Sequence, residues 1–195
     1  MYLFFDTETN GKAISFSAPA SDSDNWPRIT QLAWQLYDAD EKLINEKSHL
    51  IKPDGWVVPK EKFFTDNNMS TERCEEFGVP LAEVISDFLK DMNQSEHLIA
   101  HNINFDLPVI DSEFIRLKIT PEKRPNKFCT MLESVSFCKL PGYYGKYKWP
   151  SLIELHAKLF KEEFSSAHDA LGDVKACSKS FFELKKLGHI LNLQG

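Results

Sequence analysis

The stretch YLFFDTETNG, residues 2–11, is an apolar run that ends in two acids one residue apart. Its first four residues, Tyr2 to Phe5, have the pattern of a short buried strand. On a strand, side chains two residues apart point to the same face, about 6.5–7 Å apart along the chain. Asp6 and Glu8 therefore form a paired acidic patch at the strand end, although an ordinary acidic turn would give the same short pattern.

The composition is that of a soluble globular protein. The chain has 195 residues, enough for one domain with a substantial core, so we expect a single domain over residues 1–195. It has no apolar run long enough to cross a membrane and no signal-peptide pattern, so we expect a cytoplasmic protein without membrane contact. Its four cysteines are widely spaced without a CxxC pair, which argues against a disulfide framework or a zinc site.

The net charge does not decide whether the partner is a nucleic acid. The formal charge is −6, which by itself weighs against such a partner. Divalent cations held by some of the acids would reverse the local field, and the objection then loses its force.

The order of elements expected from the sequence indicates an α/β fold with a mixed sheet. A polar loop over residues 12–26 separates the first strand from a hairpin that turns at DADE, which makes the first three strands antiparallel. We expect strands over 2–5, 29–37, 43–51, 97–102 and 126–130, and helices over 70–78, 80–92, 105–119, 131–138, 150–160 and up to Leu187, with Gly188 as the last cap. The sheet would therefore have about five strands and be flanked by helices.

A second acidic motif, HNINFD, covers residues 101–106 at a strand-to-helix junction, where Asn104 could cap the helix. Asp106 lies one turn before Ile110, at the edge of the apolar stripe of that helix. Burying an unpaired carboxylate is costly, so Asp106 needs a partner or a proton there. The alternative is a first-turn acid favoured by the helix dipole.

A third motif, HDALGD, covers residues 168–173 at the start of the last helix, where Ser166 and Asp169 resemble a capping box. Asp173 lies one turn before Cys177, on the side of the helix that we expect to be buried. His168, five residues earlier, is rotated away from Asp173 on an ideal helix. We therefore expect Asp173 to be a fixed ligand and His168 to lie at an exposed, adjustable edge.

The four acids have separate ordinary explanations, but together they point to metal ions. Acids that face one core from several element ends repel one another unless cations bind between them. All-oxygen ligands select hard ions such as Mg²⁺ or Mn²⁺. Two such ions, about 3.5–4 Å apart, are the usual device for in-line attack on a phosphodiester. The expected cofactors are two divalent cations, held by Asp6, Glu8, Asp106 and Asp173.

In this order, the three motifs resemble the DEDDh 3′–5′ exonucleases, a family with a ribonuclease-H-like fold. The resemblance runs from Tyr2 to about Leu187, and the histidine five residues before the last aspartate separates this branch from its tyrosine-bearing sibling. It implies that Asp6 bridges both metals, that Glu8 and Asp173 complete the site that activates water, and that Asp106 holds the second metal. His168 would be the general base, for which a near-neutral pKa is suited.

The same resemblance implies hydrolysis of the terminal phosphodiester, with release of nucleoside 5′-monophosphates from a 3′ end. Thr7, Thr9, Asn102 and Phe105 would lie beside the terminal nucleotide. Phe105 would either stack on a base or pack in the core.

The segment CKLPGYYGKYKWP, residues 138–150, places Lys146 and Lys148 among aromatic residues. Cations for phosphates beside aromatic faces for bases are typical of single-strand binding, so both lysines are candidate substrate contacts. The alternative is a solvated hairpin or a disordered loop.

Several functional alternatives stay open. We favour DNA with single-stranded or frayed 3′ ends as the substrate, and a 3′–5′ exoribonuclease is the alternative. A non-catalytic nucleic-acid-binding scaffold would not need the complete set of acids. A haloacid-dehalogenase-type phosphatase, whose strand ends in DxDxT, would leave the second and third motifs without a role. A homodimer and association with a polymerase are both open, although no obvious polymerase-binding tail follows the last helix.

Overall fold

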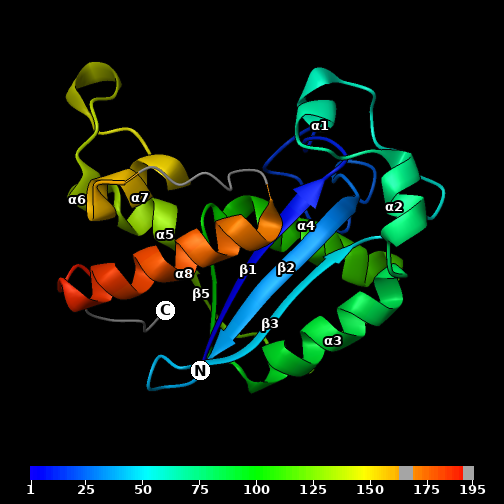
Figure 1. Ribbon diagram of the computed structural model, residues 1–195, viewed down its shortest axis with the longest axis horizontal. Coiled ribbons are helices and arrows are strands. Elements are labelled where there is room, and N and C mark those ends of the chain that lie inside the picture. The colour runs from blue at the N-terminus through cyan, green and yellow to red at the C-terminus, as the bar shows by residue number, and fades with distance from the viewer. Residues whose placement is uncertain (163–168, 191–195) are drawn as a thin grey trace.

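A five-stranded mixed sheet lies at the centre of the part of the chain that the structure, a computed structural model, describes: residues 1–162 and 169–190 (Figure 1). The strands are β1 (Tyr2–Thr9), β2 (Ile29–Tyr37), β3 (Leu43–Leu50), β4 (His97–Ala100) and β5 (Asn126–Cys129), in the order β3-β2-β1-β4-β5. The first three strands are antiparallel neighbours, whereas β4 runs parallel to both β1 and β5. The predicted mixed sheet of the ribonuclease-H-like type is confirmed.

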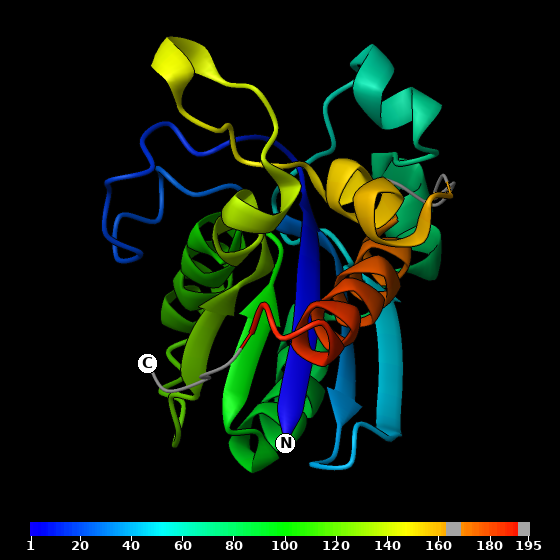
Figure 2. The same cartoon turned by 90° about the vertical axis from the view of Figure 1, so that its left-hand side faces the viewer.

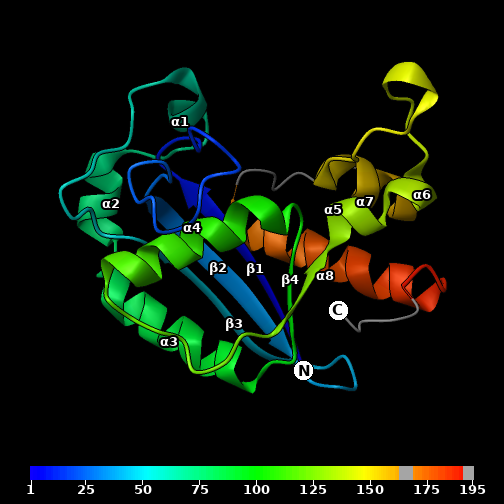
Figure 3. The ribbon, with the colours of Figure 1, turned by 180° about the vertical axis from the view of Figure 1, so that it is seen from behind.

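Helices cover both faces of this sheet. Those of the described residues are α1 (Lys62–Asp66), α2 (Thr71–Phe77), α3 (Leu81–Gln94), α4 (Ile103–Arg116), α5 (Thr130–Glu133), α6 (Val135–Cys138), α7 (Leu152–Phe160) and α8 (Ala170–Lys186), with a 3₁₀ turn η1 (Tyr143–Gly145). α8 crosses one face, and α3 and α4 cover the other (Figures 1 and 3). None of the helices in these residues is long and apolar enough to span a membrane.

The opening apolar run is explained by burial on both faces of the sheet. Leu3 and Phe5 belong to the core cluster on the side of α3 and α4. Tyr2 and Phe4 belong to the cluster on the side of α8, where Phe4 lies 5.2 Å from Phe181, ring centre to ring centre. Because neither face of such a strand is exposed to solvent, its sequence is a continuous hydrophobic run and does not alternate with polar residues.

Several element boundaries differ from the sequence expectations. β1 continues through both acids to Thr9, the short helix α1 was not expected, and the helix expected over 131–138 is divided at Ser134 into α5 and α6. α4 begins two residues early: Asn102, in a left-handed conformation with φ 75°, precedes it, so the expected cap Asn104 lies inside the first turn. A left-handed residue at this junction turns the chain sharply out of β4 and leaves the start of α4 beside β1.

The ends of α8 also differ in detail. Asp169 is the N-cap itself, because its side chain accepts a hydrogen bond of 3.2 Å from the backbone N–H of Gly172. Ser166, the expected cap, lies outside the described residues. At the other end Leu187 is the C-cap, and Gly188 follows it with φ +74°, which favours glycine.

Three segments extend past the carboxyl end of β1 (Figure 2). They are the loop over residues 10–28, the region of α1, and the hairpin that contains η1. In parallel arrangements, ligands bind beyond the carboxyl ends of the strands. The fold thus places Asp6 and Glu8 at the floor of the region that these segments surround.

Candidate active site

The pairing of β1 leaves one side of its acidic end open to other elements. β1 pairs with β2 as far as Thr9, whereas its pairing with β4 ends at Phe4. Asp6 and Glu8 lie two and four residues after Phe4 and so share the face covered by α8. Past Phe4, the other side of β1 is occupied by the start of α4 instead of a strand.

Three carboxylates meet on the α8 side of β1. Oxygen atoms of Asp6, Glu8 and Asp173 all lie within 4.8 Å of one another, and we call these residues the carboxylate trio. Asp173 lies in the first turn of α8, on the same side as the buried residues Ala170, Val174 and Cys177. The sequence prediction that an acid of the last helix faces the paired acids of the first strand agrees with this placement.

Asp106 approaches the trio from the α4 side. Its side chain is 4% exposed, and its Oδ1 accepts hydrogen bonds from the backbone N–H (3.1 Å) and the hydroxyl (2.7 Å) of Thr7. Thr7 points to the opposite face of β1 from Asp6 and Glu8, because side chains alternate along a strand. The two bonds therefore fix Asp106 against the strand that carries Asp6 and Glu8.

Burial and mutual repulsion raise the pKa values of Asp6, Glu8 and Asp106, which disfavours their ionised forms. Burial raises the pKa of Asp6 well above its ordinary value, and the charges of Asp106, Asp173 and Glu8 raise it further. Burial, followed by the charge of Asp173, raises the pKa of Glu8 to about 7. Burial raises the pKa of Asp106 to about 7, although the hydrogen bonds from Thr7 favour its ionised form.

This electrostatic arrangement suits divalent cations. A site that crowds carboxylates together and keeps them from ionising gains most from a cation placed between them. The donor atoms of the trio are all carboxylate oxygens, which fit a hard ion such as Mg²⁺ or Mn²⁺.

Asp169 and Gln31, for which the sequence predicts no role in the site, also bear on the described part of the site. His168 lies outside the described residues. Asp169, next to it, adds its charge to those that raise the pKa of Asp6 and Glu8. Gln31 of β2 donates a 2.9 Å hydrogen bond to Asp169, and its side-chain oxygen accepts one of 3.4 Å from the N–H of Ala170. Gln31 thereby ties the start of α8 to the sheet, a contact for which the local sequence has no signal.

Two cavities lie near the carboxyl ends of β1 and β4, and the first of them adjoins the acids. The first, about 620 Å³, is lined by Glu8, Thr9 and Phe105 and by Phe63 and Phe64 from the α1 segment. We call it the Thr9 cavity. The second, about 690 Å³, is lined by residues that include Asn102, Phe16 and Trp149, and we call it the Asn102 cavity.

The predicted substrate contacts are distributed over these cavities and the hairpin. Thr9 and Asn102 line one cavity each, and half-buried Phe105 lies with its ring centre 6.2 Å from that of Phe16. Thr7 is buried, and its hydroxyl is used by Asp106.

Residues 138–150 form a hairpin that displays its aromatic residues. Its strands meet at a bridge between Pro141 and Tyr147. Tyr143, Tyr144 and Trp149 are exposed, as is Lys146. Lys148, the other predicted phosphate contact, forms an ion pair with Glu154 at the start of α7. We call this segment the aromatic hairpin.

His101 connects the base of the aromatic hairpin to the HNINFD junction. Its Nε2 lies 3.0 Å from the carbonyl oxygen of Pro150, and its Nδ1 lies 3.0 Å from the hydroxyl of Thr130. Burial lowers the pKa of His101 to about 4, so the ring is neutral near pH 7. Because the Pro150 carbonyl can only accept, we assign the proton to Nε2, and Nδ1 then accepts from Thr130.

The fold and the acids together define a class: nucleases of the ribonuclease-H-like type that use divalent metal ions. An exonuclease family model matches residues 3–181, and the chain therefore belongs to this 3′–5′ exonuclease family. The assignment predicted from the three motifs is confirmed, and the phosphatase alternative is set aside. No curated protein sequence matches the chain.

Solved structures share the fold. E. coli exonuclease I in complex with a dT13 oligonucleotide matches with a TM-score of 0.72 and 20% identity, over 95% of this chain and 40% of that chain. A moderately thermophilic exonuclease I from Methylocaldum szegediense matches with a TM-score of 0.69 and 21% identity, over the same shares. The chain thus spans about 40% of the length of these structures, and at this identity the likeness establishes the fold.

Proposed function

We propose that this chain removes nucleoside 5′-monophosphates one at a time from the 3′ end of single-stranded or frayed DNA, with two divalent cations as cofactors. The observation that carries the proposal is the carboxylate trio, whose oxygens lie within 4.8 Å of one another with Asp106 beside them. Membership of the exonuclease family supplies the reaction class.

The acids have distinct roles in this proposal. Asp6 would help to hold both cations, Glu8 and Asp173 would help to hold the cation that activates water, and Asp106 would help to hold the cation that stabilises the leaving oxygen. When bound, the cations supply positive charge that activates water and stabilises the leaving oxygen. Thr7 keeps Asp106 oriented through two hydrogen bonds to a single oxygen. The remaining acceptor capacity of that carboxylate is then available to a cation.

His168 acts as the general base. The water loses a proton to the imidazole as its oxygen bonds to the terminal phosphorus, and the bond from phosphorus to the 3′ oxygen of the preceding nucleotide breaks. That oxygen takes up a proton to become the new 3′-hydroxyl. An imidazole suits this role because its unperturbed pKa lies near neutrality.

The substrate lies along the two cavities. The terminal nucleotide occupies the Thr9 cavity, where Phe105 offers an aromatic face beside Glu8. The strand continues through the Asn102 cavity toward the aromatic hairpin, where Lys146 meets phosphate and exposed rings stack on bases. Lys148 could bind a phosphate of the strand only after its ion pair with Glu154 is broken. DNA is favoured because E. coli exonuclease I, of the same fold, is seen with dT13 and dA16 oligonucleotides.

Digestion of matched oligonucleotides tests this function. The purified chain is incubated with single-stranded DNA and RNA of one sequence, labelled at the 5′ end, in Mg²⁺, in Mn²⁺ and in EDTA. We expect a ladder of products shortened from the 3′ end on DNA, release of 5′-monophosphates, and no reaction in EDTA or with Asp6→Asn. Faster digestion of RNA would replace the proposed substrate by RNA. Endonucleolytic products, or cleavage in EDTA, would contradict the proposal.

A further inference from the structure

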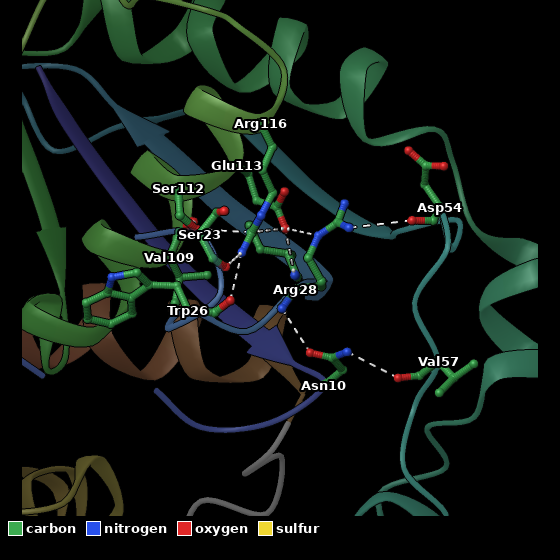
Figure 4. Close-up of polar contacts among 11 residues, drawn as sticks. Asn10, Ser23, Trp26, Arg28, Asp54, Val57, Val109, Ser112, Glu113 and Arg116 are labelled. Carbon is green, nitrogen blue, oxygen red and sulfur yellow. Dashed lines mark hydrogen bonds and ion pairs between the residues drawn. The ribbon is translucent and has the colours of Figure 1, made fainter. Parts of the chain in front are cut away.

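A buried carboxylate outside the site ties several segments of the chain together (Figure 4). The side chain of Glu113, on α4, is 1% exposed. Its Oε1 accepts hydrogen bonds from Arg28 Nε at 2.8 Å and from the backbone N–H of Ile29 at 3.3 Å, and Arg116 Nη1 lies 3.1 Å from it. A charge buried this deeply is tolerated only with such partners.

The two arginines extend this network to the loops around the site. Arg116 donates to the backbone carbonyl oxygens of Ser23 and Trp26, the latter at 2.8 Å. Arg28 Nη1 lies 3.5 Å from the carbonyl oxygen of Asp54. α4 is thus connected through one carboxylate to the loop over residues 10–28 and to the segment that precedes α1.

Asn10, the residue directly after β1, closes the network on the side of the strand (Figure 4). Its Oδ1 accepts a 2.9 Å hydrogen bond from the backbone N–H of Arg28, and its Nδ2 donates one of 3.1 Å to the carbonyl oxygen of Val57. Its own backbone N–H donates to the carbonyl of Arg28 at 3.0 Å. Both polar groups of the side chain are therefore used to join three segments.

The segments joined in this way contribute residues to the walls of the Asn102 cavity and the Thr9 cavity. The loop over residues 10–28 carries Phe16, which lines the Asn102 cavity. The segment after Val57 leads to Phe63 and Phe64, which line the Thr9 cavity. Glu113 lies two turns after Asp106 on the same helix. The bonds of Glu113 therefore connect the helix that carries Asp106 to the segments that form the cavity walls.

We propose that Asn10 and Glu113 are positioning residues that hold the walls of the cleft around the 3′ end, and that they set how tightly the strand binds. This inference depends on the proposed function. Neither residue is among the acids proposed to hold the metals. Loss of either anchor therefore loosens the walls, while the chemistry at phosphorus continues once the strand is bound.

Steady-state kinetics of two variants on two substrates test this role. Glu113→Gln removes the buried charge but keeps the shape of the side chain, and Asn10→Ala removes the links to Arg28 and Val57. Asn45→Ala is the matched control, because it removes a 2.7 Å side-chain amide bond to Asp91 near the far end of β1. The substrates are a single-stranded oligonucleotide and the p-nitrophenyl ester of thymidine 5′-monophosphate, which takes the place of the terminal nucleotide alone.

We expect KM for the oligonucleotide to rise roughly tenfold in both variants, with kcat within about threefold of wild type. KM for the small ester should rise by no more than about threefold, because the ester meets only the wall of the Thr9 cavity. The control should match wild type on both substrates. Equal losses on both substrates, or an unchanged KM, would overturn the inference. If Glu113→Gln does not fold, Asn10→Ala decides the outcome alone. Inactivity of the wild type on every substrate would instead mean that the proposed function is wrong, and the inference would fall with it.

Discussion

Replacing Glu8 by glutamine should stabilise the metal-free protein at alkaline pH. Burial raises the pKa of the Glu8 carboxyl from 4.5 to about 7, so its ionisation is less favourable in the folded than in the unfolded chain. A shift of this size corresponds to about 3 kcal/mol of lost stability once the pH exceeds the folded-state pKa. Glutamine cannot ionise, and the variant avoids that cost.

The sign of the pH dependence follows from proton binding. Between the unfolded-state pKa and about 7, the folded chain holds a proton on Glu8 that the unfolded chain has lost, so stability falls as the pH rises through this window. The gain from Glu8→Gln should therefore approach about 3 kcal/mol at pH 8 and stay below about 1 kcal/mol at pH 5.

Urea denaturation in EDTA at the two pH values measures this difference. Comparison of each variant with wild type at the same pH cancels the contributions of histidines such as His101, whose pKa is lowered to about 4 and which acts in the opposite direction. Glu75→Gln, at an exposed position of α2, is the matched control and should change little at either pH. Added Mg²⁺ should stabilise the wild type more than Glu8→Gln, since binding to the folded state alone raises stability. A destabilised Glu8→Gln protein at pH 8, or an equal gain at both pH values, would refute the reasoning.

Three further changes have defined outcomes. His168→Ala should reduce turnover by roughly 10²–10⁴-fold with the thermal midpoint unchanged, and near-normal rates would exclude the general-base role. Asp6→Asn and Asp173→Asn should each abolish metal-dependent digestion and leave the far-UV circular dichroism of the folded chain, whereas loss of folding would make these acids structural. His101→Phe leaves the hydroxyl of Thr130 and the carbonyl of Pro150 without this partner and should cost about 1–3 kcal/mol in urea denaturation, with a higher KM for oligonucleotides. An unchanged urea midpoint of His101→Phe would argue against His101 as the residue that stabilises the base of the aromatic hairpin.

Local periodicity was enough to predict the acids on β1 and α8. Asp6 and Glu8 follow the two-residue period of the strand, and Asp173 lies four residues before Cys177 on the buried side of its helix. The continuous apolar run before Asp6 likewise agrees with a strand buried on both faces. These features depend on neighbours in the chain, and a pattern in the sequence is sufficient to find them.

Contacts between distant segments could not be predicted in this way. Glu113 meets Arg28 across 85 residues, and Gln31 meets Ala170 across 139 residues. A glutamate in the middle of a helix or a glutamine in a strand is compatible with solvent exposure, so its burial depends on partners that no local pattern identifies. The role of Asn10 has no local signal for the same reason, since both groups that its side chain contacts come from other segments.

The predicted helix cap at the start of α4 was wrong because Asn102, which precedes the helix, has a left-handed conformation. Asn104 has the residue type of a helix cap, but the turn at Asn102, with φ 75°, starts the helix earlier. Asparagine adopts this conformation more readily than most residues, which makes Asn102 suited to it. The choice between two asparagines depends on where β4 stops, and the sequence does not specify that boundary closely.

The central position of β1 also determines the order in which parts of the molecule open. This strand is paired with β2 along its length and with β4 over Tyr2 to Phe4, and its side chains enter both cores. We expect its amides to exchange with deuterium only when the whole chain unfolds, whereas those of the short, peripheral α1 exchange through local opening. Asp6 and Glu8 would then be carried by the slowest-exchanging strand, and one wall of the Thr9 cavity by a segment that opens readily. Such a division keeps the reacting groups fixed while the cleft adjusts to bases of different size.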